Sequence, residues 1–236
     1  MLNNIKDEGI ILNVKDFREN DKKVDIILAN DGIISAVAFG AKKSRKRFGG
    51  NLDPYNLADF EILSTKKGFY LKEVSIKKIF TNIKQNIQTL SILFNITKLL
   101  TSKPFNINKN IYNALLKLLI KLEDEKNDMT RYYLSFLIYF LKKEGLFSST
   151  NCYICNSRDV HHLIFDQDSL LFVCKKCSNS KDNLTDEEID FLKTCLNGDK
   201  RFQNKHYDIS TLLKIELLLI EYINRHFYII LDKLQK

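Results

Sequence analysis

The chain has no long uninterrupted apolar segment, and this argues against a membrane-spanning helix. No stretch of about 18 uncharged apolar residues, the length such a helix needs, occurs in it. The apolar segments Leu217–Ile220 and Phe227–Leu231 are separated by Glu221, Asn224 and Arg225. The first residues, MLNNIKDEGII, also lack a basic region followed by an apolar stretch and a cleavage site. We therefore expect a cytoplasmic location and no membrane partner.

Signatures of several enzyme classes are also missing. The sequence contains neither a phosphate-binding loop of the G-x-x-x-x-G-K-[ST] type nor a G-x-S-x-G nucleophile motif. None of the four histidines stands in the H-x-E pattern that precedes a C-x-x-C pair in nucleic-acid deaminases. We therefore predict a protein without catalytic residues and keep a nucleic-acid-processing enzyme as an alternative.

Cysteine is scarce but strongly patterned. Of five cysteines, four form two C-x-x-C pairs, Cys152 with Cys155 and Cys174 with Cys177, and 18 residues separate the pairs. This spacing is typical of a zinc ribbon, in which two tight turns aim four thiolates at one ion. Four unrelated thiols and two disulfides are the alternatives. We predict one structural Zn²⁺, because four protein ligands leave no open position for water or substrate. The lone Cys195 makes an odd count, which favours a reducing compartment.

Residues 8–80 combine short apolar runs with turn residues, a pattern typical of β-strands. Asp31-Gly32 is a hairpin signal, and Gly68 ends a second turn. Five strands are expected, at Gly9–Phe17, Val24–Ala29, Ile33–Phe39, Asn56–Ser64 and Phe69–Phe80. Five short antiparallel strands close most economically into a small barrel, and the OB-fold is a common solution. An SH3-like barrel would produce a similar pattern.

After residue 80 the apolar period becomes helical. We expect helices over Thr81–Thr101, Ile107–Glu125, Asp128–Lys143 and Asp208–Leu231, and a short helix opened by a Thr185/Glu188 capping box. The prediction is an α+β protein with an OB-fold domain (residues 1–80), a helical domain (81–147 and 184–236) and an embedded zinc module (148–183).

The positive charge of the chain is unevenly distributed. The formal net charge is +8, yet residues 148–236 contain 12 Lys/Arg against 13 Asp/Glu. Five of the six residues between 42 and 47 are cationic: Lys42, Lys43, Arg45, Lys46 and Arg47. A polyanion would relieve their mutual repulsion and release its own counterions. We therefore predict that this basic loop binds nucleic acid, and that Arg18, Lys22 and Lys23 extend the surface. Phe48 either anchors the loop on the barrel or stacks on a base.

The N-terminal segments resemble those of the RecO family, bacterial mediators of DNA repair and recombination. The matching residues are Gly9-Ile10-Ile11-Leu12, Asp16-Phe17-Arg18-Glu19-Asn20-Asp21-Lys22, Gly32 to Lys42, Arg47-Phe48-Gly49-Gly50 and Leu52-Asp53-Pro54-Tyr55. The two C-x-x-C pairs, with Gly145 before them, also agree in place. The chain departs from the family at Asn156, where glycine is usual after the second cysteine, and it lacks the proline often found before the ribbon.

The resemblance implies a nucleoid-associated protein that binds single- and double-stranded DNA and anneals complementary strands. It also implies three partners: RecR, the acidic C-terminal tail of the single-stranded-DNA-binding protein and, indirectly, RecA. A tail of that kind needs an apolar groove rimmed by cations. Arg131 is our candidate for the rim, because it lies where the family's helix before the ribbon carries arginine. An RNA-binding OB/zinc-ribbon protein stays an alternative, because phosphate contacts alone do not separate RNA from DNA.

Overall fold

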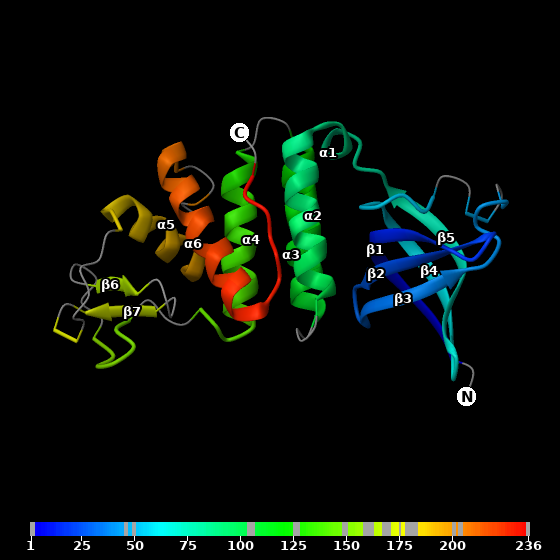
Figure 1. Cartoon of the computed structure of the whole chain (residues 1–236), viewed down its shortest axis with the longest axis horizontal. Helices are drawn as coiled ribbons and strands as arrows, with labels where there is room; N and C mark the ends of the chain where they lie inside the picture. The colour runs from blue at the N-terminus through cyan, green and yellow to red at the C-terminus, as the bar shows by residue number, and fades with distance from the viewer. Residues whose placement is uncertain are drawn as a thin grey trace. The chain divides into compact units, whose positions relative to one another are not determined.

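A computed structural model of the chain describes residues 3–44, 47–48, 51–102, 107–124, 128–147, 151–157, 163–166, 171–174, 176–177, 184–199, 202 and 205–234. The chain divides into two compact units, residues 1–127 and 128–236. The first contains the strands β1–β5 and the helices α1–α3, and the second contains everything that follows (Figure 1). Within the described residues, no helix combines the length and the apolar character needed to cross a membrane.

Five strands close into a barrel in the order β1-β2-β3-β5-β4, which confirms the predicted OB-like sheet. All neighbouring pairs are antiparallel except β3 with β5, which is parallel. The strands are β1 (Asn3–Phe17), β2 (Asp21–Leu28), β3 (Gly32–Ala38), β4 (Leu57–Thr65) and β5 (Gly68–Lys78).

Alternation of side chains produces the barrel core. In β3, Ile34, Ala36 and Ala38 are buried, and the residues between them face outward. Gly32 opens this strand with a φ of 71°, which a residue with a Cβ adopts only at a cost. A Cβ at Gly32 would also lie 2.8 Å from the Ile107 carbonyl oxygen. The hairpin glycine therefore serves both the turn and the approach of the segment that leads into α3.

Three helices belong to the same unit as the barrel: α1 (Asn82–Gln85), α2 (Ile87–Thr101) and α3 (Lys109–Glu123). The sequence predicts a single helix over Thr81–Thr101, and this prediction is wrong at Asn86. Asn86 is extended (φ −103°, ψ 122°), and its side chain accepts hydrogen bonds from the backbone N–H groups of Gln88 and Thr89. The asparagine therefore ends α1 and caps α2.

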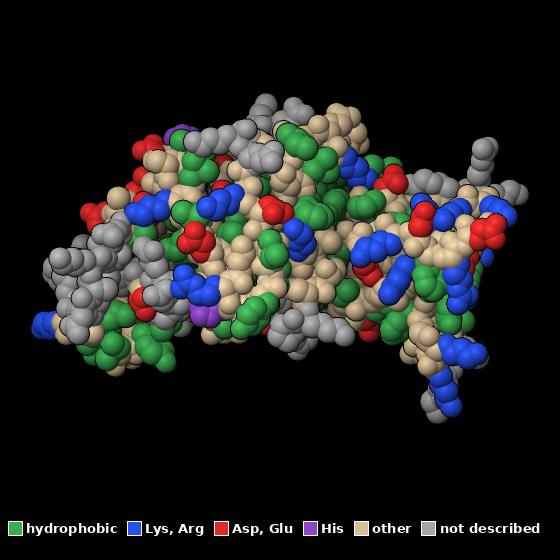
Figure 2. Space-filling view, viewed as in Figure 1, with side chains coloured by type: hydrophobic (Ala, Val, Ile, Leu, Met, Phe, Trp, Pro, Cys, Tyr) green, Lys and Arg blue, Asp and Glu red, His purple; other side chains and the backbone are tan. Residues whose placement is uncertain are grey.

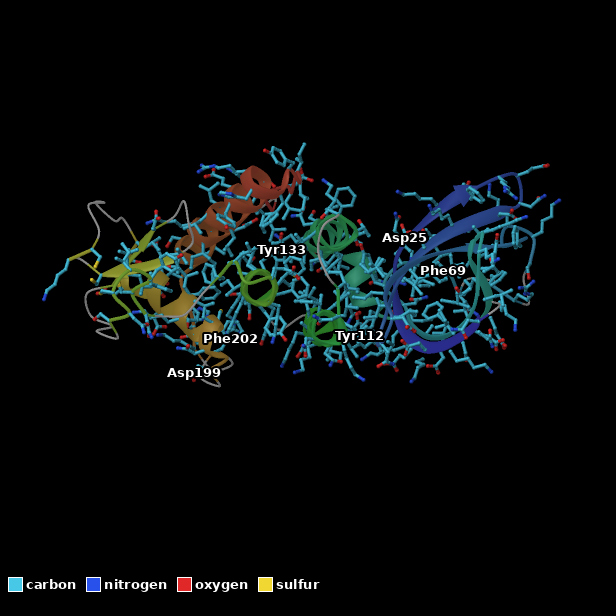
Figure 3. All side chains as sticks on the ribbon, turned by 90° about the horizontal axis from the view of Figure 1, so that it is seen from below. Asp25, Phe69, Tyr112, Tyr133, Asp199 and Phe202 are labelled. Atoms are coloured by element: carbon cyan, nitrogen blue, oxygen red, sulfur yellow. The ribbon has the colours of Figure 1, made fainter. Side chains whose placement is uncertain are left out.

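Hydrogen bonds tie these helices to the barrel. The Tyr112 hydroxyl of α3 donates to Glu8 of β1 over 2.6 Å, and Lys84 of α1 donates to Asn56 over 2.7 Å. The Tyr55 hydroxyl pairs with Thr97 of α2 at 2.9 Å. Figure 3 shows Tyr112 on the helical side of the barrel strands. Each helix of the unit therefore has at least one polar contact with the barrel or with the segment between β3 and β4.

The second unit contains α4 (Met129–Lys143), β6 (Leu163–Asp166), β7 (Leu171–Cys174), α5 (Asp186–Asn197) and α6 (Ile209–Phe227). The predicted capping box is present, with Thr185 and Glu188 each bonded to the other's backbone. Helix α6 ends before the predicted Leu231, because Tyr228 is left-handed (φ 56°). The chain then turns back, and the Leu231 backbone N–H donates to the side chain of Asn224.

Candidate nucleic-acid interface and metal centre

The basic loop, residues 42–47, leaves the barrel directly after β3. Gly40, with a φ of 65°, turns the chain, and its carbonyl oxygen accepts from the N–H groups of Lys43 and Ser44 at 3.0 and 2.9 Å. The N–H of Lys42 donates to the carbonyl of Asn20 over 3.1 Å. The start of the loop is therefore fastened to the turn between β1 and β2. Arg45 and Lys46 lie outside the described residues.

The described cations of the basic loop face solvent. Lys42, Lys43 and Arg47 are all exposed. Lys42 forms an ion pair with Asp16 at 3.1 Å, but this carboxylate is 74% exposed. Exposed pairs contribute only about 0–1 kcal/mol, so a phosphate can displace Asp16. Arg47 donates to the backbone carbonyl of Lys72 over 3.0 Å, a bond that positions its guanidinium without neutralising it.

The turn between β1 and β2 lies beside the basic loop. Arg18 is exposed in this turn with a φ of 53°, and its carbonyl oxygen accepts from the Lys42 ammonium at 3.4 Å. On β2, Lys23 is exposed and Lys22 is half-buried opposite Asp16. The structure thus brings the Arg18 backbone and the Lys42 side chain together, and DNA binding by these cations stays a prediction. Figure 2 shows Lys and Arg side chains spread over the surface of the barrel unit.

Phe48 anchors the loop. It is 2% exposed and belongs to the core cluster of the barrel, together with Leu52 and Phe60. The Arg47 guanidinium lies 4.9 Å from the centre of its ring. A ring enclosed in this way has no free face for a base, so the stacking alternative and the predicted DNA contact of Phe48 are corrected. Sequence reasoning also missed Asp16, whose only signal was its place two residues before Arg18.

Arg131 is not a rim residue. Its side chain is buried in the second unit, with 8% of the residue exposed. The guanidinium donates to the backbone carbonyls of Phe202 and Lys205 at 3.3 and 2.7 Å, and it lies 4.9 Å from the ring centre of Tyr132. Arg131 therefore holds the segment before α6 against α4, and its predicted place at a tail-binding groove is corrected.

Four cysteines of the second unit converge on one point. The sulfur atoms of Cys152, Cys155, Cys174 and Cys177 all lie within 4.8 Å of one another. Cys155 and Cys174 are 3.6 Å apart, and no cysteine of the chain is in a disulfide. A tetrahedron with Zn–S bonds of about 2.3 Å has sulfurs about 3.8 Å apart, so the four thiols fit a metal ion. The disulfide alternative is thereby wrong.

The first C-x-x-C pair sits in a tight turn that supplies its own backbone bonds. The N–H of Cys155 points at the Cys152 sulfur over 3.5 Å, and the N–H of Asn156 donates to the Cys152 carbonyl over 2.8 Å. Asn156 has a φ of 57°, a left-handed conformation that asparagine tolerates better than most residues. The departure from the usual glycine therefore leaves the turn intact. Tyr153 joins the turn to β7 by donating from its N–H to the Phe172 carbonyl.

The environment separates the thiols in acidity. A hydrogen bond from the Cys155 backbone N–H is the main cause that lowers the pKa of Cys152 to about 6. Hydrogen bonds with the thiols of Cys174 and Cys155 raise the pKa of Cys177 to about 12. Four crowded thiols cannot all ionise unaided. A bound cation would remove this conflict, which is what a thiolate metal site requires.

Comparison with known proteins identifies a family that matches nearly the whole chain. The sequence profile described as recombination protein O N terminal matches residues 1–80, and the profile described as recombination protein O C terminal matches residues 85–235. The chain belongs to the RecO family. Membership associates the chain with DNA repair and recombination, and it agrees with the OB-like barrel and the exposed cations beside it.

Curated proteins named DNA repair protein RecO are similar to this chain along most of its length. The protein of Mesoplasma florum is 26% identical over 239 residues, covering 94% of this chain and 86% of that protein. The protein of Mycoplasma mycoides is 28% identical over 213 residues, covering 86% and 84%. The protein of Alkaliphilus metalliredigens is 22% identical over 176 residues, covering 73% and 72%. These RecO proteins are relatives across both units, not across the barrel alone.

Proposed function

We propose that this RecO-family chain is a non-catalytic mediator that binds single- and double-stranded DNA through the basic surface of its barrel. The observation that carries the proposal is the meeting of the basic loop with the β1–β2 turn, where Lys42, Lys43, Arg47 and Arg18 are exposed on adjoining segments. Cations on adjoining segments can follow successive phosphates of one strand. Binding then releases condensed counterions, which supplies a large sequence-independent part of the free energy.

Strand annealing follows from the same surface. Two complementary strands repel each other through their phosphates, and a cationic surface lowers that repulsion while leaving the bases free to pair. No chemical step is needed, which agrees with the absence of the three catalytic motifs considered above. Family membership favours DNA over the RNA-binding alternative and mediation over nucleic-acid processing.

The remaining parts of the proposal rest on family membership. RecR and the C-terminal tail of the single-stranded-DNA-binding protein are the proposed direct partners, RecA loading is the proposed outcome, and the bacterial nucleoid is the proposed location. The metal is proposed to be Zn²⁺, held by Cys152, Cys155, Cys174 and Cys177. Four thiolates close its coordination, so the ion would stabilise the fold of the second unit and would not act on substrate.

The proposal is tested by the salt dependence of binding. A variant with Lys42, Lys43 and Arg47 changed to Ala should bind DNA more weakly, and each lost phosphate contact should lower the log–log salt slope by about 0.7 to 0.9. The matched control changes Lys117, Lys143 and Lys233 to Ala, three exposed lysines from α3, α4 and the C-terminal segment. Both variants lose three positive charges, so an equal slope in the two would remove the basic loop from the proposal.

Annealing is measured on complementary strands coated with the single-stranded-DNA-binding protein, with and without the full chain. The proposal predicts faster annealing with the wild type and a smaller acceleration with the loop variant. Cleavage of either strand by pure protein with added Mg²⁺ would contradict the non-catalytic assignment. Equal competition by matched RNA would contradict the preference for DNA.

A further inference from the structure

A pocket with aromatic and cationic walls opens on the outer face of the barrel. Its volume is about 470 Å³, within the range of about 300–1,000 Å³ that is typical of ligand sites. The walls come from the β1–β2 turn, from β2 and β3, and from the turn that leads into β5. The side chains that matter here are Phe17, Arg18, Lys23, Phe39, Lys67 and Tyr70. We refer to it as the aromatic pocket.

Strand register brings these side chains together. Lys23 of β2 stands opposite Val37 of β3, and Val37 stands opposite Tyr70 of β5. The neighbouring residues Ala36 and Ala38 are buried in the barrel, so Val37 and Phe39 face outward. The parallel pairing of β3 with β5 thus sets Tyr70 of β5 beside Val37, whose partner on the other side is Lys23. Figure 3 shows Phe69, the neighbour of Tyr70, within the barrel.

Two rings in the pocket form a stack, and one of them is partly exposed. The centres of the Phe39 and Tyr70 rings are 5.2 Å apart and their planes differ by 15°. Phe39 is nevertheless 45% exposed, unlike the buried Phe48 nine residues later in the same segment. An aromatic ring with one face on a neighbour and much of the rest in water can accept a further planar group, as aromatic platforms for bases do.

Three cations line the same pocket as this stack. The Arg18 guanidinium lies 5.1 Å from the centre of the Phe17 ring, and Lys23 and Lys67 are exposed. The carbonyl of Arg18 also accepts from Lys42, so the same residue of the β1–β2 turn lines the aromatic pocket and contacts the basic loop. Aromatic rings with cations at their edge are the arrangement that binds single-stranded nucleic acid, in which bases stack and phosphates pair with Lys and Arg.

We propose that the aromatic pocket binds unpaired DNA by stacking a base on Phe39, with the flanking phosphates held by Arg18, Lys23 and Lys67. The inference rests on the proposed function and deepens it, because it assigns an added affinity for single strands to a place separate from the basic loop. A duplex keeps its bases stacked on one another and presents only phosphates. The pocket therefore adds affinity for single strands and almost none for duplex.

The test compares single-stranded and duplex oligonucleotides bound to full-length Phe39→Ala. Loss of one stacked base costs about 1–3 kcal/mol, so single-strand affinity should fall by about 5- to 150-fold. Duplex affinity should stay within about twofold, and the salt slope should not change because no phosphate contact is lost. Phe94→Ala is the matched control, since Phe94 of α2 is 54% exposed and lies outside the pocket. It should leave both affinities unchanged.

A second variant gives a direct signal. The chain contains no tryptophan, so Phe39→Trp introduces a single fluorophore into the stack. Single-stranded DNA should quench its fluorescence and duplex DNA should not, while single-strand affinity should equal or exceed that of the wild type. Phe39→Leu keeps the apolar bulk without an aromatic face and should resemble Phe39→Ala.

These measurements separate the two proposals. If Phe39→Ala binds single strands as the wild type does, or weakens single strands and duplex equally, the aromatic pocket is not a base site. An unquenched tryptophan also overturns the inference. In each of these cases a reduced salt slope in the basic-loop variant would leave the proposed function standing. If the wild type binds neither form of DNA, the proposed function itself fails.

Discussion

At the scale of single residues, burial decided the roles of two side chains whose type alone suggested a binding surface. Arg131 is predicted to meet a ligand, and Phe48 either to meet one or to anchor its loop, and both are used inside the protein. Arg131 carried a readable warning, because it shares a helical face with Leu134, Ile138 and Leu141, all of them buried. Phe48 carried none, because its environment comes from strands distant in sequence.

Arg131 should contribute to stability and not to recognition. Arg131→Ala leaves the carbonyls of Phe202 and Lys205 without their donor, and hydrogen bonds to charged groups contribute about 1.5–3 kcal/mol each. We expect the free energy of unfolding to fall by about 2–4 kcal/mol in urea titrations. Arg131→Lys should restore only part of the lost free energy of unfolding, because an ammonium lacks the planar fork of a guanidinium group.

The control for this prediction is Lys143→Ala, an exposed substitution on the same helix, which should change stability by less than about 0.5 kcal/mol. If Arg131→Ala kept full stability and lost binding of an acidic tail peptide, the rim assignment would be reinstated.

Glu8 should make the barrel unit sensitive to acid. Hydrogen bonds from Lys77 and Tyr112, both 2.6 Å long, lower the pKa of this carboxyl in the folded chain. The unfolded chain then binds the proton more readily, with a pKa of about 4.3. The stability that Glu8 contributes is present above that pH and is lost as pH falls through the lower folded value.

The measurement is the urea midpoint of wild type and Glu8→Gln between about pH 7 and pH 3, the range that spans the ordinary Glu pKa. The wild type should be the more stable protein at neutral pH, and the difference should shrink on acidification. Tyr112→Phe removes one of the two donors. The stability of this variant should therefore fall less on acidification than the stability of the wild type. A difference that stays constant with pH would contradict the assignment.

At the scale of elements, local sequence signals predicted well whether a segment is a helix or a strand. They predicted poorly where a helix is interrupted or ends. Strand alternation, the Asp31-Gly32 turn and the Thr185/Glu188 capping box appear in the structure where the sequence indicated them. The break at Asn86 was missed, because the apolar period continues across it and only the side-chain cap distinguishes two helices from one. The end of α6 was missed for a related reason, since Ile229 and Leu231 are buried without being helical.

The two turns that present the cysteines should depend on metal for their order. We expect one zinc per chain by mass spectrometry under native conditions, and loss of zinc in Cys174→Ser. Removal of the ion by a chelator should expose residues 151–157 and strand β7 to hydrogen exchange, because ligand binding free energy is folding free energy in such sites. The affinity for zinc should fall with acidification, since protons compete with the metal for the thiolates.

Cys195→Ser is the matched control, because Cys195 lies on α5 and outside the four-cysteine cluster. It should keep the full zinc content. A chain that folds identically, with equal exchange protection in these turns after complete metal removal, would contradict a structural role.

At the scale of the whole molecule, the sequence predicted the fold and the cysteine cluster better than it predicted which side chains meet on the surface. The OB-like barrel and the four-cysteine cluster follow from short-range patterns. The aromatic pocket does not, because Phe39 and Tyr70 become neighbours only through the parallel pairing of β3 with β5, which no local pattern encodes. The predicted division into three domains, with boundaries at residues 80, 147 and 183, stays a prediction. The structure groups α1–α3 with the barrel in one compact unit.

Closure of the barrel affects how copies of the chain meet one another. An open sheet presents unpaired N–H and C=O groups along its edge, and such edges join between molecules when proteins are concentrated. Here β3 and β5 meet through the pairs Ala36–Phe69 and Val37–Tyr70, and this contact closes the five described strands into a barrel. Under the proposed function, chains gathered along one DNA strand would not be joined to one another by strand addition at their barrels.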